Sequence, residues 1–315
     1  MKILVTGATG FLGRAIVAAC QASGHETVAF SRHATTSGVS GATFDGDVRD
    51  PRALADAAAD CDSVCHSAAL VSVWRRHASE FDDVNVGGLR HVLDVVRDRG
   101  IPRLVYTSSF LALPPTGADR PQQWNDYQRT KVLADRLADR AVAEGVPLVR
   151  LYPGVIYGPG PLTEGNLVGG MIADHLAGRL PGLVGADCRW SYAFVDDVAA
   201  GHVAALERGE IGARYRLCGE NARQMAVFEI VRELTGRPLP RRLPASLAAA
   251  VGLFEEWRAA LTHRPPLLTV GTVEILTRDW AFDSDLAIRD LGYRITSLRD
   301  GVARIVAQLR HGVEP

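Results

Sequence analysis

The sequence lacks an excess of charge of either sign. Its 35 Lys and Arg residues are offset by 36 Asp and Glu residues, which leaves a formal net charge of −1 at pH 7. These charges are interspersed along the chain rather than gathered in blocks. We therefore expect neither nucleic acid nor an anionic membrane surface among its partners.

Long apolar stretches are also lacking. The chain opens on "MKILVTGATGFLG", which contains no apolar run of the length found in signal peptides. The longest later run, around "ASLAAAVGLF", is shorter than the about 20 residues needed to cross a bilayer. The sequence thus predicts a cytoplasmic protein with no membrane partner.

Cysteine is scarce and odd in number. The five cysteines lie mostly inside apolar runs, which is typical of reduced core thiols: Cys20, Cys61, Cys65, Cys188 and Cys218. Cys61 and Cys65 are one residue too far apart for a CxxC motif, and no His/Cys cluster completes a metal site. We predict no metal.

What is present is a regular alternation of two periodicities. Short β-rich runs are separated by longer stretches whose apolar residues recur at helical spacing; the predicted strands are 2–6, 27–30, 42–44, 63–68, 103–108 and 147–152. Strict alternation of strand and helix predicts βαβ units with right-handed crossovers. The fold class is therefore α/β, with a doubly wound parallel sheet of the Rossmann type.

The second half of the chain loses this rhythm. Glycine and proline crowd "PGVIYGPGPLTEG", and we predict one more strand at 213–218. We expect a first domain over residues 1–153, with 193–218 returning to it, and a smaller lobe over 154–192 and 219–315.

A glycine-rich turn follows the first strand. Gly7, Gly10 and Gly13 in "TGATGFLGRA" permit a tight turn and let a pyrophosphate approach the amides at the start of the next helix. This context predicts dinucleotide binding, and three further residues of the turn join the candidate cofactor site: Thr9, Phe11 and Leu12.

The end of the second strand indicates which dinucleotide is bound. An acidic residue there would bind the ribose hydroxyls of NAD, but the chain has Ser31 followed by Arg32. A guanidinium binds phosphate well, so NADP(H) is favoured, with NAD(H) as the alternative and a solvated surface arginine as the simpler interpretation. Asp47, after the third strand, is predicted to face the adenine, with a polar surface residue as the alternative, and Val48 beside it joins the cofactor candidates.

Several motifs in this order resemble the extended short-chain dehydrogenase/reductase family: "TGATGFLG" at 6–13, "DGDVRD" at 45–50, "CHSAAL" at 65–70, "NVGG" at 85–88, "YTSS" at 106–109, "YQRTK" at 127–131, "RLYPGVIYGPG" at 150–160 and "FVDDVAAGHVAAL" at 194–206. The chain most resembles the branch of dihydroflavonol 4-reductase and 3β-hydroxysteroid dehydrogenase. Nucleotide-sugar enzymes of the family typically carry an asparagine near the position that Gly154 occupies here.

The resemblance implies a set of catalytic residues. Tyr127 would be the general acid, and Lys131, one helical turn later, would lower the tyrosine pKa from about 10 and bind the nicotinamide ribose. Ser109 would hold the substrate oxygen, with Ser108 as the less favoured candidate. Asn85 resembles the asparagine that anchors a water relay to the lysine, although a helix N-cap is the alternative.

The resemblance also extends the binding site. Beyond the glycine turn, the implied cofactor contacts are Ser67, Ala68, Ala69, Thr107, Tyr127, Lys131, Pro153, Gly154 and Val155. The predicted substrate walls are apolar and aromatic: Val71, Trp74, Phe110, Trp124, Ile156, Tyr157, Met171, Trp190 and Tyr192. Such walls favour a hydrophobic ring ketone over a nucleotide sugar.

Together these features predict an NADP(H)-dependent oxidoreductase that reduces a carbonyl on a hydrophobic, cyclic small molecule. An NAD(P)-dependent sugar epimerase or dehydratase is one alternative, and a non-catalytic NADP-binding sensor is another. The charged helices near 82–99 and 125–144 leave monomer and homodimer equally open.

Overall fold

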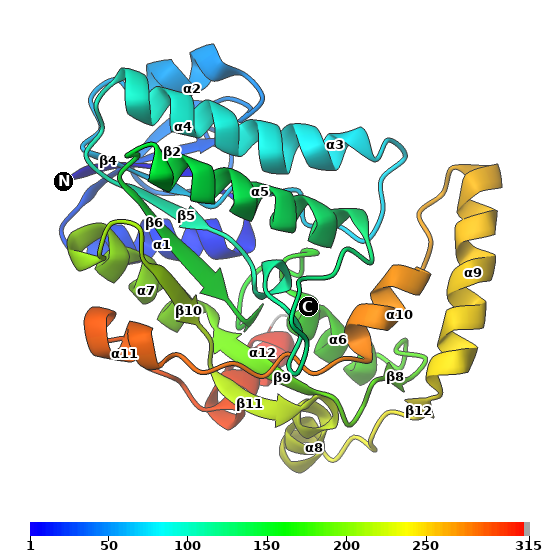
Figure 1. Cartoon of the computed structure of the whole chain (residues 1–315). Helices are drawn as coiled ribbons and strands as arrows, with labels where there is room; N and C mark the ends of the chain where they lie inside the picture. Colours follow the sequence, from blue (N-terminus) through cyan, green and yellow to red (C-terminus); the bar gives the residue numbers. More distant parts are fainter. Residues whose placement is uncertain (312–315) are drawn as a thin grey trace.

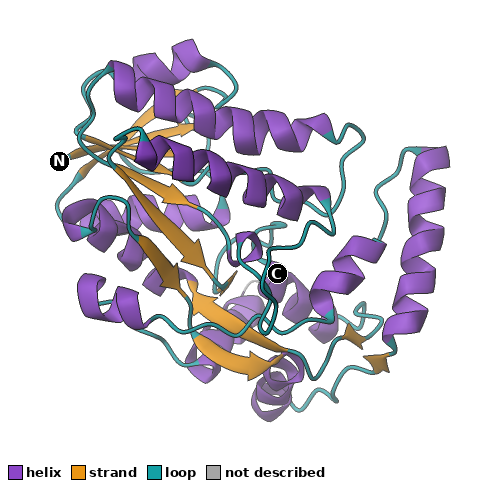
Figure 2. Ribbon diagram, in the orientation of Figure 1, coloured by secondary structure: helices purple, strands orange, loops and turns teal. Residues whose placement is uncertain are grey.

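A computed structural model describes residues 1–311, and its centre is a seven-stranded parallel sheet (Figures 1 and 2). The strand order is β10-β6-β5-β4-β1-β2-β3, and every neighbouring pair is parallel. The strands are β1 (Lys2–Thr6), β2 (Glu26–Ser31), β3 (Ala42–Asp45), β4 (Ser63–His66), β5 (Leu104–Thr107), β6 (Leu148–Pro153) and β10 (Arg214–Leu217). The predicted doubly wound sheet is confirmed.

Helices cover both faces of this sheet, because successive residues of each strand point to opposite sides. Ile3 and Val5 of β1 join a core beneath α1 (Phe11–Ala22) and α7 (Val195–Arg208). Leu4 faces the opposite core, beneath α2 (Pro51–Ala57), α4 (Gly88–Asp98) and α5 (Asp126–Ala143). The strand ends that follow β1, β4 and β5 therefore open onto one common edge.

The second half contains more strands than the single one predicted at 213–218. A three-stranded sheet is made of β7 (Val155–Tyr157), β9 (Arg189–Phe194) and β11 (Glu220–Arg223), and a short pair is made of β8 (Leu183–Val184) and β12 (Arg242–Leu243). Three of these strands have only two or three residues and lie among glycines and prolines, so their pattern is too short to recognise.

Six helices complete this half: α6 (Leu167–Leu176), α8 (Gln224–Thr235), α9 (Ala245–Thr262), α10 (Val270–Leu276), α11 (Asp285–Leu291) and α12 (Leu298–His311). A third core joins several of them to the small sheet. The predicted division into two domains at 153, 193 and 218 stays a prediction.

Within residues 1–311, no helix combines the length and the apolar character that crossing a bilayer requires. All five cysteines are free thiols.

Candidate active site

The glycine turn packs so tightly that it admits no side chains. Gly7 has φ +70°, and a Cβ added there would lie 2.7 Å from Ala68 Cα. A Cβ on Gly13 would lie 2.1 Å from the Gly7 carbonyl oxygen. Gly10 caps α1 without a side chain, so the first amides of that helix stay available to an anion. This cradle fits the pyrophosphate of a dinucleotide.

The other residues of the turn are held by the body of the protein. The carbonyl of Thr9 accepts a hydrogen bond from Arg14 Nε at 3.1 Å. Phe11 is buried, and its ring lies 3.1 Å from the position of a Cβ on Gly160, which brings the loop after β7 over the turn. Leu12 is half-buried and packs against the core beneath α1.

At the end of β2, polar groups are left without partners. The Ser31 hydroxyl is buried and has no hydrogen-bond partner in the described part of the chain. Arg32 is exposed and, within residues 1–311, enters no ion pair. Both groups remain free for a ribose or a phosphate.

Asp47, by contrast, is already engaged. Arg49 donates to its two carboxylate oxygens at 3.0 and 2.7 Å, and this hydrogen bonding lowers the Asp47 pKa, with a smaller contribution from the charge of Arg32. Val48 is buried and its carbonyl accepts from His91 Nδ1 at 3.0 Å. If Asp47 contacts the adenine as predicted, its carboxylate must bind the adenine and Arg49 at the same time.

The predicted catalytic residues come together where β5 ends and α5 begins. Asn125 caps α5, its side chain accepting from the Gln128 amide at 2.8 Å, and this fixes the first turn that carries Tyr127. Lys131 is buried; its Nζ donates to the Thr107 carbonyl at 3.2 Å and lies 5.9 Å from the centre of the Tyr127 ring.

Burial sets the proton affinities of this pair. It raises the pKa of Tyr127 to about 12, a rise that interaction with the Ser109 side chain opposes. The expected lowering is therefore wrong for the protein by itself, because burial disfavours the phenolate. Burial also lowers the pKa of Lys131 to about 8, against an opposing effect of Asp135.

The two serine candidates differ in their surroundings. Ser109 is buried at the start of a short 3-10 turn (η2, Phe110–Ala112), and its Oγ accepts from the Leu111 amide at 3.2 Å. Its hydroxyl proton is therefore free to be donated elsewhere. Ser109, and not Ser108, acts on the pKa of Tyr127.

Asn85 lies inside a helix rather than at its start. It belongs to a π-helical turn (η1, Asp82–Gly87) between α3 (Ser79–Phe81) and α4, so the N-cap interpretation is wrong. Its Oδ1 accepts from the Leu70 amide at 2.7 Å, and its Nδ2 donates to Thr130 Oγ1 at 3.0 Å. Asn85 thereby ties the loop after β4 to the helix of Tyr127.

The remaining cofactor candidates line the same sheet edge. Ser67 Oγ donates to the Thr6 carbonyl at 2.7 Å, and Ala68, which follows it, lies beside Gly7; Ala69 comes next in the chain and is half-buried. Pro153 and Val155 are buried on either side of Gly154. A Cβ on Gly154 would lie 2.5 Å from the Ser191 carbonyl oxygen, so a larger residue such as asparagine does not fit there without a shift of the backbone.

Four aromatic side chains pack together near Tyr127. Phe110 lies 5.3 Å from Trp280 and 6.3 Å from Trp190, and Trp124 lies 6.3 Å from Trp280, all between ring centres. Trp124 is half-buried, while the other three are buried. The sequence did not point to Trp280, whose cue was a tryptophan beside Phe282 in the stretch after 277.

Gln128 was also missed, although it belongs to the motif that contains Tyr127. It is fully buried; its Oε1 accepts from the Trp124 amide at 3.1 Å and its Nε2 donates to the Leu111 carbonyl at 3.3 Å. The cue was its position three residues before Lys131, on the same face of α5.

Two predicted substrate walls belong to the core instead. Tyr157 has no exposed surface, and its hydroxyl donates to the Ser297 carbonyl at 3.4 Å. Tyr192 is 2% exposed and packs edge-on against Tyr157 at 6.0 Å. Ile156, whose side chain alternates with that of Tyr157 along β7, is half-buried against the core of the large sheet.

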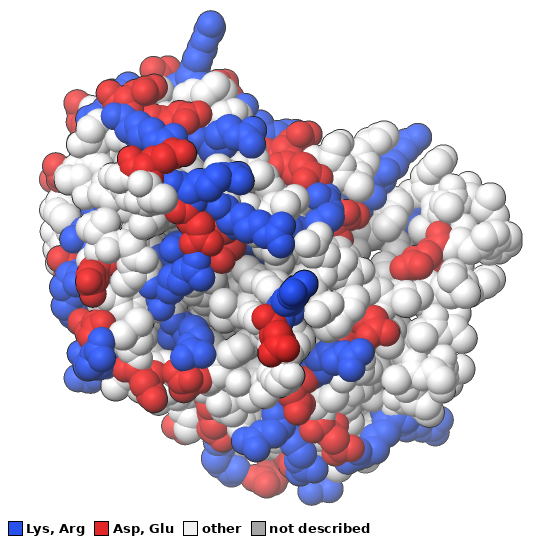
Figure 3. All heavy atoms as spheres, viewed as in Figure 1, with Lys and Arg blue, Asp and Glu red and all other residues white. Residues whose placement is uncertain are grey.

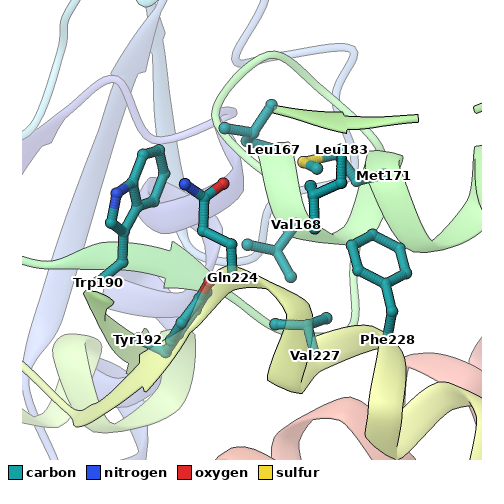
Figure 4. A pocket seen from close by; sticks show the side chains of 9 residues that line it. All are labelled: Leu167, Val168, Met171, Leu183, Trp190, Tyr192, Gln224, Val227 and Phe228. Carbon is teal, nitrogen blue, oxygen red and sulfur yellow. The ribbon is translucent and has the colours of Figure 1, made fainter. Parts of the chain in front are cut away.

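Met171, Trp190 and Tyr192 meet at a small cavity of about 20 Å³, shown in Figure 4. A void of that size holds little more than a water molecule. The other lining residues are Leu167, Val168, Leu183, Gln224, Val227 and Phe228. Val71 and Trp74 lie elsewhere, half-buried on the loop after β4, so the structure does not gather all nine predicted walls into one pocket.

The arrangement described above has known counterparts. The model of the NAD dependent epimerase/dehydratase family matches residues 3–218. The chain belongs to this family. It is an NAD(P)-dependent enzyme of the extended short-chain dehydrogenase/reductase type, as the motifs predicted.

Curated relatives of this family member include reductases and dehydrogenases. It is 32% identical to sterol demethylase protein B of Methylococcus capsulatus, over 98% of each chain. It is 30% identical to a 2-alkyl-3-oxoalkanoate reductase of Stenotrophomonas maltophilia, over 98% of this chain and 99% of the relative. A 3-beta-hydroxysteroid dehydrogenase of Mycolicibacterium neoaurum is 26% identical, over 93% and 86%.

Solved structures share the whole fold. The crystal structure of gox2253 superposes with a TM-score of 0.82 at 29% identity, covering 99% of this chain and 98% of that one. The UDP-glucuronic acid 4-epimerase of Bacillus cereus, solved with UDP-glucuronic acid and NAD, gives a TM-score of 0.77 at 20% identity, over 99% of both chains. The latter likeness shows the fold alone.

Proposed function

We propose that this enzyme uses NADPH to reduce a carbonyl on a hydrophobic small molecule, with Tyr127 as the proton donor. The observation that carries the proposal is the cluster of Ser109, Tyr127 and Lys131 at the sheet edge. The lysine is buried and held by the Thr107 carbonyl, where its charge faces the tyrosine ring.

Each side chain has a defined task in this proposal. When bound, the nicotinamide supplies the hydride. Ser109 keeps its proton and donates a hydrogen bond to the substrate oxygen, since its Oγ already accepts from the Leu111 amide. Tyr127, protonated at neutral pH because burial raises its pKa to about 12, then gives its proton to that oxygen. The Lys131 ammonium favours the phenolate that remains.

NADP(H) is the proposed cofactor because of what lies at the end of β2. Arg32 is exposed and its guanidinium suits a 2′-phosphate, while the buried Ser31 hydroxyl has no hydrogen-bond partner among residues 1–311. An acid at this position, which NAD enzymes of this fold use for the ribose, is missing.

A hydrophobic carbonyl compound is the proposed substrate class. Trp124 directly precedes the helix of Tyr127, is half-buried, and is backed by the buried rings of Trp280 and Phe110, so it offers an apolar surface beside the tyrosine. The close approach of Gly154 to Ser191 leaves no space for the asparagine typical of nucleotide-sugar enzymes. Two relatives are named for the reduction of an oxoalkanoate and for the dehydrogenation of a hydroxysteroid.

The test is NADPH consumption with a panel of 2-alkyl-3-oxoalkanoates, 3-ketosteroids and dihydroflavonols. Tyr127→Phe should abolish turnover while NADPH still binds. Tyr293→Phe is the matched control, because the Tyr293 hydroxyl is buried and has no hydrogen-bond partner in residues 1–311, so its loss should not affect turnover. Full activity in Tyr127→Phe would refute the proposed role. If NADPH binds but no carbonyl compound is reduced, and UDP-sugars turn over with NAD, the epimerase alternative is correct.

The cofactor preference needs a second comparison. Arg32→Gln should raise KM for NADPH about 10- to 150-fold, with that for NADH nearly unchanged, since one charge-assisted phosphate contact contributes about 1.5–3 kcal/mol. Arg136, an exposed arginine on α5 with no ion pair in residues 1–311, provides the control substitution Arg136→Gln. An equal effect of Arg32→Gln on both cofactors would contradict the assignment.

A further inference from the structure

Helix α9 carries an apolar face that nothing in the described chain covers. It stands at the margin of the molecule in Figure 1, and the same region is largely white in Figure 3. Six of its residues are between 43% and 65% exposed: Leu247, Val251, Leu253, Phe254, Trp257 and Leu261. Most share one face by their helical spacing, and Phe254 and Trp257 lie 5.9 Å apart between ring centres.

The opposite face anchors α9 to α10. Gly252 approaches so closely that a Cβ there would lie 3.0 Å from the Val270 amide. Glu256 accepts from that amide at 2.9 Å, and Glu255 binds Arg258 and accepts from the Leu267 amide at 2.8 Å. All three charged residues of the helix are thus used within this hairpin, and the outer face carries no free charge.

Unpaired cations flank the two ends of the helix. Arg241 precedes the helix, and Arg264 follows it beside Leu267, which is 86% exposed. Neither arginine enters an ion pair within residues 1–311, whereas Arg242 pairs with Asp187. If α9 of one copy packed on α9 of another, arginines would meet in either direction of pairing, and that like-charge contact disfavours a second copy as the occupant.

We propose that the outer face of α9 docks on an anionic lipid bilayer. The 18-residue helix, about 27 Å long, would lie in the plane of the interface with its leucines and aromatic rings among the acyl chains. Arg241 and Arg264 would contact lipid phosphates at the two ends. This departs from the expectation of no membrane partner, because that expectation considered charge along the sequence and not the uncovered face.

Helix α10, to which α9 is anchored, packs against the segment that leads into the helix of Tyr127. Gly271 of α10 packs against Trp124, where an added Cβ would lie 2.0 Å from the Trp124 carbonyl oxygen. Trp124 directly precedes the helix that carries Tyr127. On the basis of the proposed reduction of hydrophobic carbonyls, docking would place the site next to the phase in which such a substrate dissolves.

Vesicle flotation tests the docking. The full-length protein should float with vesicles made of equal parts phosphatidylcholine and phosphatidylglycerol, and much less with phosphatidylcholine alone. Phe254→Gln combined with Trp257→Gln should lower the partition constant at least about tenfold. Arg241→Gln and Arg264→Gln should each lower it about fivefold, only with the anionic vesicles.

The matched control is Leu286→Gln combined with Ile288→Gln, two exposed apolar residues of α11 that should leave flotation unchanged. A blue shift of Trp257 fluorescence on vesicle addition, absent in Trp257→Phe, gives a second readout that needs no disruptive variant. Docking is refuted if the native protein stays in solution, or if both double variants float equally. It is also refuted if the native protein forms a dimer that the α9 variant loses and does not bind vesicles.

The flotation experiment and the activity assay test the two proposals separately. Vesicle binding requires no turnover, so it can be observed even if the enzyme reduces none of the carbonyl compounds. Conversely, reduction of a short, water-soluble ketone should be the same in the α9 double variant as in the native enzyme, since none of its residues touches the catalytic cluster.

Discussion

Gly13→Ala should abolish dinucleotide binding while leaving the fold intact. The new Cβ would lie 2.1 Å from the Gly7 carbonyl oxygen and 2.9 Å from Ala8 Cα, whereas ordinary contacts begin at 3.4 Å. Both contacts are backbone atoms, so no side chain can rotate away. Helix α1 must therefore separate from the turn by about 1 Å. A misplacement of that size typically weakens the function of a positioned group about 100-fold, and we expect a loss of this order in the affinity for the dinucleotide.

The effect on stability should be much smaller. Alanine is the better helix former by about 1 kcal/mol, which partly offsets an overpacking cost of about 1–3 kcal/mol. The buried side of α1, with Ile16, Val17 and Cys20 in the core, is unchanged. We expect a modest loss of stability and a cooperative melt.

The assay is titration with NADPH, followed by quenching of tryptophan fluorescence, beside a thermal melt. Gly170→Ala is the control, because a Cβ on that helical glycine meets nothing within 4 Å and should stabilise the protein slightly without changing affinity. A dissociation constant for Gly13→Ala within threefold of the native value would show that the turn does not hold the pyrophosphate.

Three further outcomes are expected. Ser109→Ala should lower kcat about 100- to 1,000-fold with NADPH affinity unchanged, and normal turnover would exclude it as the oxygen-binding group. Burial lowers the Lys131 pKa from 10.5 to about 8, so the folded protein loses this proton before the unfolded chain does. Between pH 8 and 10.5, the free energy of unfolding of the native protein, measured in urea, should therefore rise by up to about 3 kcal/mol relative to that of Lys131→Met. A difference between the two proteins that does not change with pH would contradict this. Trp280→Ala should cost about 3–5 kcal/mol, because the ring is fully buried between Phe110 and Trp124; a loss below 1 kcal/mol would show that the aromatic cluster is not tightly packed.

The pKa of Tyr127 differs from the expectation drawn from the sequence, although the position of the residue is the expected one. Its place on α5, one turn before Lys131, follows from helical spacing. The direction of its pKa shift depends on burial and on where the Lys131 ammonium is held, at the Thr107 carbonyl. Neither quantity is encoded in the local pattern.

The sequence by itself determined what depends on neighbours along the chain. The period of apolar residues specified the order of strands and helices, and the glycine turn specified where a dinucleotide could approach, because both follow from backbone geometry over a few residues. The end of β5 then placed Ser109, and the start of α5 placed Tyr127, at the same edge of the sheet.

Only the tertiary structure decided which side chains face each other, face the core or face outward. It buried Tyr157 and Tyr192, inserted Trp280 beside Phe110, and bound Asn85 to Thr130. It also left one face of α9 bare, although its residues are as apolar as those of many core helices. Burial and pairing depend on contacts between residues far apart in the chain, and such contacts exist only once the fold has formed.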